Sequence, residues 1–247
     1  LAVIRDEQSM VEAVERLQKT LDDAERHQFD SLLGELRARR DAAAVSTEQD
    51  PEILVAEARK ALKKARNRVG RWSLDDNGFQ AVSGGFKKTY KRGRKAKKQA
   101  FRSDEASDFH EWRKRVKYHV HHLQLLRPLW PHVNKAWGKE AKALADILGD
   151  DHDLSIVYSL LESEGEPLAK GQTRQHLQEI ILREQWRLRG QAWEIGQRLY
   201  AEKPEILTKR WKHYWHTWQV SEGLVPRFVA QPERVTNILG GMAPPLM

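Results

Sequence analysis

The sequence contains no cysteine among its 247 residues. A disulfide scaffold, a zinc–thiolate site and a cysteine nucleophile are therefore excluded. Glycine and proline are scarce, at 15 and 9 residues, which favours long helices. No run approaches the roughly 18 apolar residues that a transmembrane helix needs, and no signal-peptide pattern is present. We therefore expect a cytoplasmic helical protein without thiol chemistry and without a membrane partner.

What the sequence has in excess is positive charge. It carries 43 Lys and Arg against 35 Asp and Glu, for a formal net charge of +8. This balance predicts a polyanionic partner, which could be nucleic acid, a membrane surface or a phosphate polymer. Nine tryptophans and a hydrophobic fraction of 40% supply a core and argue against a disordered chain.

The positive charge is concentrated in one segment. Between Gly85 and His121 there are 13 Lys and Arg against four Asp and Glu, so the rest of the chain is close to neutral. Charge that serves only solubility would be scattered over the surface. The segment is therefore predicted to bind an anion.

Helical periodicity covers nearly the whole chain, and no alternating strand pattern is evident, which predicts an all-α fold. Turn signals are expected to break the helices at 73–85, and a further break is expected at 149–150, between a helix that ends at 148 and one that begins at 151. The last segment, 220–247, contains proline and glycine and is expected to be a loosely ordered tail. The expected helices are 4–17, 21–44, 51–69, 86–101, about 105–126, 133–148, 151–162, 171–200 and 205–219.

The helix at 108–126 is predicted to carry the chemistry. Projection at 100° per residue gives two neighbouring stripes. One is apolar and should face the core: Phe109, Trp112, Val116, Val120 and Leu123. The other is basic and lies beside it: His110, Arg113, Lys114, Lys117 and His121.

The basic stripe is suited to a chain of phosphates. Like charges four residues apart repel, and no acidic residue is interleaved on this face, so a multivalent anion would offset the repulsion. Positions 110 to 121 span about 16 Å of helix. Arginine can bind phosphate bidentately, and histidines beside phosphate would gain positive charge. Binding is therefore expected to strengthen in mild acid.

Two other interpretations of the histidines compete with this one. His110 and His121 could be half-buried helix residues that hydrogen-bond to neighbours. They could also be metal ligands, but they lie too far apart on one helix to share an ion, and the stripe offers no carboxylate. We therefore expect neither a metal nor a cofactor.

The same residues carry a family resemblance. The run from Phe109 to Tyr118, Phe-His-Glu-Trp-Arg-Lys-Arg-Val-Lys-Tyr, resembles the signature helix of CHAD domains, the conserved-histidine α-helical domains. The segment from Leu148 to Leu154 is similar to the second signature of the family. Two further segments are similar to the family: the helix before the signature helix, at Thr89–Arg94, and the closing segment, Glu202-Lys203-Pro204 with the Trp-rich helix after it. The resemblance therefore extends from about 84 to 218.

The resemblance implies an all-α domain of two four-helix bundles, related by a pseudo-twofold axis around a basic groove or channel. An internal match at an offset of 147 residues, Leu1–Asp6 with Leu148–Asp153, suggests the repeat independently. The counterpart of His110 would then lie 37 residues before Leu1. We expect a single domain at 1–220, with an N-terminally incomplete first half at 1–80, a second half at 81–220 and a tail at 221–247. The natural protein is then longer, or this copy is truncated or degenerate.

The resemblance also implies a function, which is non-catalytic binding of inorganic polyphosphate. Asp153 and Asp6 are expected to cap helices or to pair with a nearby cation. The residues carried over as polyphosphate ligands are His110, Arg113, Lys114, Lys117, His121, Arg92, Arg94, Lys95, Lys98, Arg5 and His152.

Two other functions are compatible with the charge. A nucleic-acid-binding helical module could use the same basic surface, although no DNA- or RNA-binding signature is recognisable. A phosphohydrolase or kinase would need a P-loop or a carboxylate cluster for Mg²⁺, and the basic stripe has neither. We therefore expect a binding protein in the cytoplasm, with polyphosphate granules as a candidate location. The oligomeric state is not predicted.

Overall fold

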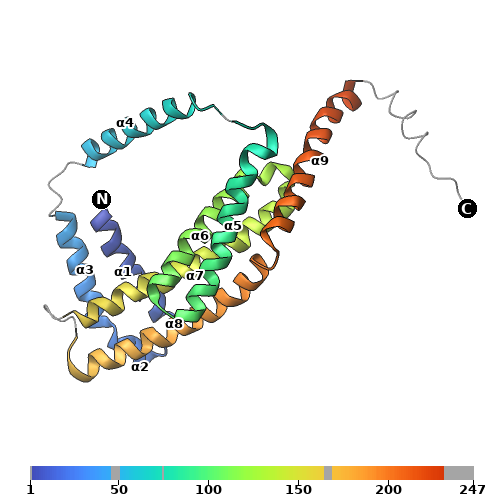
Figure 1. Cartoon of the computed structure of the whole chain (residues 1–247). Coiled ribbons are helices and arrows are strands. Elements are labelled where there is room, and N and C mark those ends of the chain that lie inside the picture. The colour runs from blue at the N-terminus through green and yellow to red at the C-terminus, as the bar shows by residue number, and fades with distance from the viewer. Residues whose placement is uncertain (1, 46–50, 74, 164–168, 231–247) are drawn as a thin grey trace, which may run out of the picture.

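The computed structural model describes residues 2–45, 51–73, 75–163 and 169–230. Over these ranges the chain forms nine α-helices and one short 3₁₀ helix, with no strand, so the predicted all-α class is confirmed (Figure 1). None of the described helices is long and apolar enough to cross a membrane. The α-helices are α1 (Ala2–Gln18), α2 (Asp23–Gln28), α3 (Asp30–Val45), α4 (Pro51–Val69), α5 (Gly78–Ser103), α6 (Ala106–Leu125), α7 (Pro131–Glu162), α8 (Gly171–Leu199) and α9 (Pro204–Ala230).

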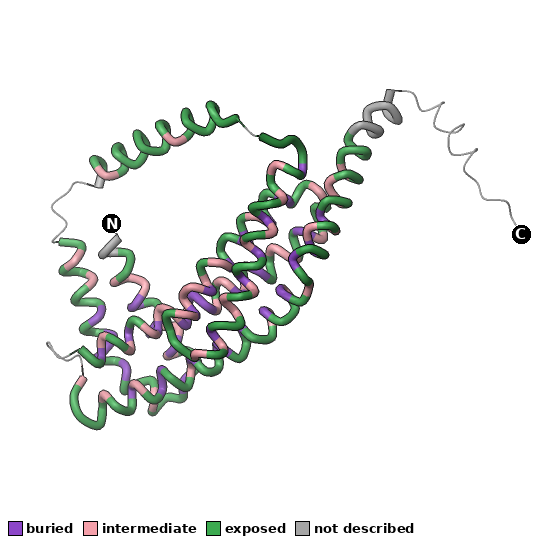
Figure 2. The backbone as a smooth tube through the Cα atoms, in the orientation of Figure 1, coloured by how far each residue is buried: buried purple, intermediate pink, exposed green. Residues whose placement is uncertain are grey.

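Two hydrophobic cores share the long helices α7 and α8. One core joins α1 and α3 to the C-terminal half of α7 and the N-terminal half of α8. The other joins α5, α6 and α9 to the opposite halves of the same two helices. Because α7 has 32 residues, it extends for about 48 Å. It is therefore long enough to serve both cores. Figure 2 marks the buried residues in purple.

The predicted apolar stripe of α6 is confirmed. All five of its residues are buried, with Trp112 and Val116 at 0% exposure. On α9, Trp211 is fully buried, and Trp215 packs against the same core. The periodicity of large apolar residues therefore located the core face of α6, because burial of such side chains is the main favourable term in folding.

Of the two predicted helix breaks, the one at 149–150 is wrong and the one at 73–85 is shorter than predicted. Helix α7 runs without interruption through Gly149 and Asp150, and α5 begins at Gly78 and contains Gly84 and Gly85. Among these glycines, Gly78 has a positive φ of 58° and marks the start of α5. Packing of α7 against α6 and α8 along its length outweighs the low helix propensity of a single glycine, about 1 kcal/mol.

One predicted helix is divided, and another is longer than expected. The segment 21–44 forms α2 and α3, which are separated at Phe29; its fully buried side chain belongs to the first core. Asp22 caps α2 by accepting a hydrogen bond from the Glu25 backbone N–H at 2.9 Å. Helix α9 continues to Ala230 instead of ending at Gln219. The remainder of the predicted tail, 231–247, lies outside the described residues.

Helix α4 stands apart from the two cores (Figures 1 and 2). From residue 52 to 69 only Leu54 and Ala65 are half-buried, and the other side chains are exposed. The exposed residues include Leu62 at 70% and Val55 at 46%. In contrast to α9, α4 therefore contributes nothing to either core.

Candidate anion-binding site

Helix α6 holds the predicted basic stripe beside its buried face. His110 and Arg113 are half-buried, whereas Lys114, Lys117 and His121 are exposed. This gradient follows from the helix geometry, since residues nearer to the apolar stripe lie closer to the neighbouring helix. The stripe therefore runs from a sheltered end at His110 to an open end at His121.

The sheltered end brings together residues that are distant in the sequence. The rings of His110 on α6 and His152 on α7 lie with their centroids 4.0 Å apart. The Arg113 guanidinium lies against the α7 backbone at Gly149, where an added Cβ would be 3.4 Å from its Nε and Nη2 atoms. Three of the predicted ligands thus form one cluster, and Gly149 leaves room for the guanidinium. We call His110, Arg113 and His152 the histidine–arginine cluster.

Burial and the neighbouring cations keep both histidines of the cluster neutral. Desolvation lowers the pKa of His110, and the charges of Lys114 and Arg113 lower it further. Desolvation, followed by the effect of His110 and Arg113, lowers the pKa of His152 to about 4. A bound anion would act in the opposite direction, because it favours the charged form of each ring.

The cluster also has buried nitrogens without a hydrogen-bond partner among the described residues. They are His110 Nδ1 and Arg113 Nε. A buried donor or acceptor without a partner costs about 1–3 kcal/mol. The residues at this end of the stripe are thus held in place by packing more than by hydrogen bonds to each other.

Acidic residues of α7 and α1 border the cluster. Asp150 and Asp153 both contact the Arg16 guanidinium of α1, at 3.0 and 3.4 Å. Asp153 lies inside α7, so of the two predicted roles it is the cation partner and not a helix cap. Arg5 pairs with the adjacent Asp6 at 3.0 Å and is exposed. The Asp6 charge opposes the lowering of the pKa of His152.

One assumption about the stripe is wrong. The helical projection placed no acidic residue on this face, but the Lys114 Nζ lies 2.6 Å from the Glu111 carboxylate. Glu111 also pairs with Arg115 on the other side. These partners hold the pKa of Glu111 below its usual range. Glu111 projects between the two cations, so the repulsion within the stripe is smaller than the helical projection indicated.

The four predicted cations of α5 do not lie on one surface. Arg92 and Lys95 line a groove beside α6, together with Glu111 and Arg115. Arg94 and Lys98 line a different cleft, which faces α8. The two pairs project from opposite flanks of α5, because helical neighbours on one face are three or four residues apart.

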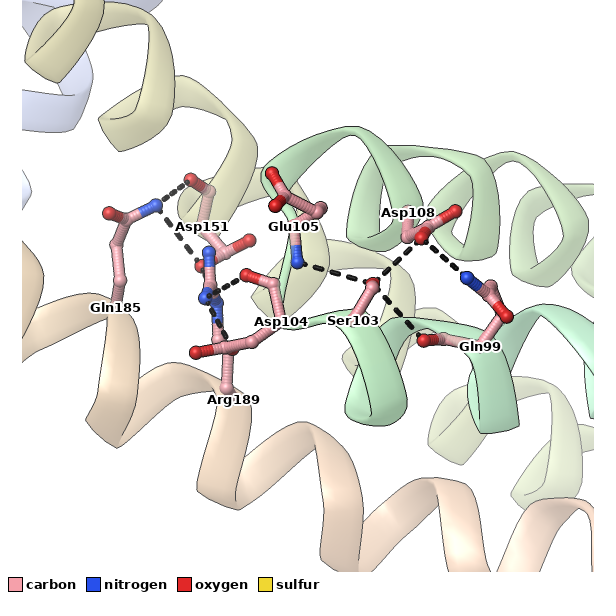
Figure 3. Close-up of polar contacts among 8 residues, drawn as sticks. All are labelled: Gln99, Ser103, Asp104, Glu105, Asp108, Asp151, Gln185 and Arg189. Carbon is pink, nitrogen blue, oxygen red and sulfur yellow. Dashed lines mark hydrogen bonds and ion pairs between the residues drawn. The ribbon is translucent and has the colours of Figure 1, made fainter.

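Sequence reasoning missed a buried polar network that anchors the second core. The Arg189 guanidinium of α8 donates to Asp151 of α7 at 2.9 Å and to Asp104, after α5, at 2.8 Å (Figure 3). Gln185 donates to the backbone oxygen of Asp151 at 3.0 Å. Arg189 also lies over the Phe109 ring, 4.2 Å from its centroid. No short motif marks this network, because its members come from three separate helices.

His119 is a second residue that sequence reasoning missed. It is 3% exposed and packs against Tyr90 and Tyr200, and burial lowers its pKa to about 3. The sequence did offer a signal for its burial, because His119 follows Trp112 by seven residues and so lies beside the apolar stripe. Over the described part of the chain, no group of three or more His, Asp or Glu could hold a metal ion.

Comparison with known proteins identifies the family. The family model for the CHAD domain matches residues 1–162, which is more than half of the chain. No curated protein and no solved structure shows a significant match. The matched residues include the basic helix α6 and the histidine–arginine cluster. The chain therefore belongs to the CHAD domain family.

Proposed function

We propose that this CHAD domain binds inorganic polyphosphate along α6 and does not hydrolyse it. The observation that carries the proposal is the histidine–arginine cluster, which opens onto the exposed Lys114 and Lys117. The cluster offers a guanidinium that can bind phosphate bidentately and two imidazoles that would become protonated beside an anion. The two lysines continue the positive surface along the helix, as a linear polymer requires.

Polyphosphate binding is a known role of CHAD domains, and the chemistry of this surface fits it. A phosphate polymer has no bases, so its site needs positive charge and little shape. The stripe from 110 to 121 extends for about 16 Å, which is enough for several successive phosphates. Because binding would release counterions, the affinity should fall steeply with salt.

The remaining predicted ligands extend the proposal. His121 continues the stripe on α6, and Arg5, which pairs with Asp6, stays a prediction as a ligand. The α5 residues Arg92, Arg94, Lys95 and Lys98 stay predictions as polyphosphate ligands. We also propose that the domain extends to 220, with a groove between its two halves, 1–80 and 81–220. The two cores do not follow this division, because α7 and α8 contribute to both.

The carboxylates near the site favour binding without catalysis. Mg²⁺ at a phosphoryl-transfer site is usually held by free carboxylates. Asp150 and Asp153 contact Arg16, and Asp151 contacts Arg189. These carboxylates already have cationic partners, and burial raises the pKa of each. CHAD domains are also generally binding domains.

Titration with long-chain polyphosphate tests the proposal. We expect saturable binding that weakens steeply between about 50 and 200 mM salt. Single-stranded RNA at the same phosphate concentration should displace little of the polymer from α6. Equal displacement would favour the nucleic-acid alternative, and no binding would refute the proposal. Phosphate released during incubation with the polymer and Mg²⁺ would show that the domain is an enzyme.

Polyphosphate affinity is expected to increase as the pH falls from 8 to 5.5. In the free protein the pKa values of His110 and His152 are lowered, so both rings are neutral at pH 7. Bound phosphate raises both pKa values, so binding takes up protons and becomes stronger in acid. Each histidine that gains a proton contributes up to about tenfold per pH unit.

The pH dependence should disappear when the two rings are replaced. His110→Gln with His152→Gln is the test variant, and His27→Gln, an exposed histidine on α2, is the control. Long chains are used so that their terminal phosphates contribute little to the titration. An unchanged slope of affinity against pH in the double variant would contradict the role of the cluster.

A further inference from the structure

A cleft between α5 and α8 combines cations with an exposed indole. It has a volume of about 470 Å³, which is in the range of sites for small organic ligands. Its polar wall comes from α5, and Trp193 of α8 lies on the other wall. The residues that line it include four cations and no carboxylate; the cations are Arg94, Lys97, Lys98 and Arg102.

Three of these cations form a row. Arg94, Lys98 and Arg102 are four residues apart, so they lie above one another on α5 over about 12 Å. None of the three makes an ion pair or a hydrogen bond with another described residue, whereas Lys114 on α6 has Glu111. Three like charges at this spacing destabilise the helix slightly. An anion in the cleft would reverse that effect.

Trp193 is held in place with much of its surface open. Its indole is 41% exposed. The Phe101 ring contacts it edge-on at a centroid distance of 4.7 Å, and Lys97 Nζ lies 5.2 Å from its centroid. Lys97 is fixed in turn by hydrogen bonds to the Gly196 carbonyl and the Gln197 side chain. The indole therefore packs against Phe101 and Lys97 and leaves the rest of its surface exposed beside the row of cations.

We propose that this cleft binds a nucleotide, with its base stacked on Trp193 and its phosphates on Arg94, Lys98 and Arg102. Basic grooves with aromatic platforms are the usual way to bind single-stranded nucleic acid, because every base has a face that can stack. Polyphosphate has no apolar part and gains nothing from an exposed indole. Arg94 and Lys98 are also predicted polyphosphate ligands, so what distinguishes this site is Trp193, which is not one of them, and its position beside α8, away from the histidine–arginine cluster.

The test compares two ligands, a labelled 12-nucleotide single-stranded RNA and free ATP, on the full chain. Trp193→Leu should weaken binding of the nucleotide ligand about tenfold, since stacking on one aromatic side chain has effects of this order. Lys98→Glu with Arg102→Glu should weaken it at least as much. If only RNA binding is weakened, the cleft binds nucleotides as part of a single strand. If ATP binding is weakened too, the cleft also binds free nucleotides.

Matched controls separate the site from general effects. Trp186→Leu removes a 62% exposed indole elsewhere on α8. Lys135→Glu with Lys139→Glu reverses another exposed pair four residues apart, on α7. Both controls should change nucleotide affinity less than twofold. Trp193→Tyr, which keeps a stacking ring, should retain most of the affinity even if Trp193→Leu lowers the stability of the fold.

Polyphosphate binding provides the last comparison. Trp193→Leu should leave polyphosphate affinity within twofold of the wild-type value. The proposal is overturned if neither RNA nor ATP binds, if Trp193→Leu behaves like Trp186→Leu, or if it weakens polyphosphate and nucleotide binding equally. Failure of polyphosphate to bind at all would refute the proposed function and leave the nucleotide result intact.

Discussion

Replacement of both Arg113 and Lys117 by glutamate is expected to weaken binding of long-chain polyphosphate about 100-fold at 0.1 M salt. Arg113 is half-buried against Gly149, so its charge is screened less than that of a surface residue. Lys117 continues the stripe one turn further on. Reversal of both charges removes two contacts and adds two repulsive ones, which together cost about 2.7 kcal/mol.

The double variant Lys135→Glu with Lys139→Glu is the control for this experiment. It makes the same change in net charge on exposed residues of α7, away from the cluster. Its polyphosphate affinity should fall much less, because only the long-range field is altered. Isothermal titration of all three proteins gives the comparison. Equal losses in the two variants would mean that polyphosphate responds to net charge, without a specific site on α6.

Arg189→Ala is expected to lower the free energy of unfolding by about 3–5 kcal/mol. The guanidinium is the cationic partner of Asp151, whose side chain is 2% exposed. It also holds Asp104, which ends α5 in a left-handed conformation with φ of 59°. Removal of Arg189 would leave a buried carboxylate without its cation (Figure 3). The loss is therefore much larger than that of a surface ion pair, at about 0–1 kcal/mol.

Urea unfolding monitored by circular dichroism measures this effect. Arg187→Ala is the control, because Arg187 lies two residues away on α8 and its partner, Glu184, is on the same helix. That change should cost less than about 1 kcal/mol. Arg189→Met with Asp151→Leu should recover most of the stability, since it removes both charges. A loss in Arg189→Ala no larger than in Arg187→Ala would show that the network is dispensable.

The helices and their buried faces were predictable because they depend on local spacing. Large apolar residues recur at helical intervals on α6 and α9, and Trp112, Val116 and Trp211 are all buried. The basic stripe followed from the same projection. Helix ends were less predictable, since glycine is only weakly unfavourable in a helix. Packing with other helices was enough to carry α7 through Gly149 and α5 through Gly84.

The distribution of the α5 cations could not be predicted from their number. Arg92 and Arg94 are two residues apart, so they project from different flanks of the helix. Which flank meets α6 and which meets α8 depends on how the helices pack. The sequence shows the charge of this segment, but it does not show that Trp193, about a hundred residues later, lies beside Arg94 and Lys98.

The helical class, the core stripe of α6 and the concentration of positive charge beside it follow from composition and spacing alone. Each of these is a periodic or compositional property that neighbouring residues create together. The contact of His110 with His152, the pairing of Asp153 with Arg16 and the contacts of Arg189 with Asp151 and Asp104 arise from the packing of the helices. These contacts link positions 38 to 137 residues apart and depend on the packing of whole helices, which no local pattern encodes.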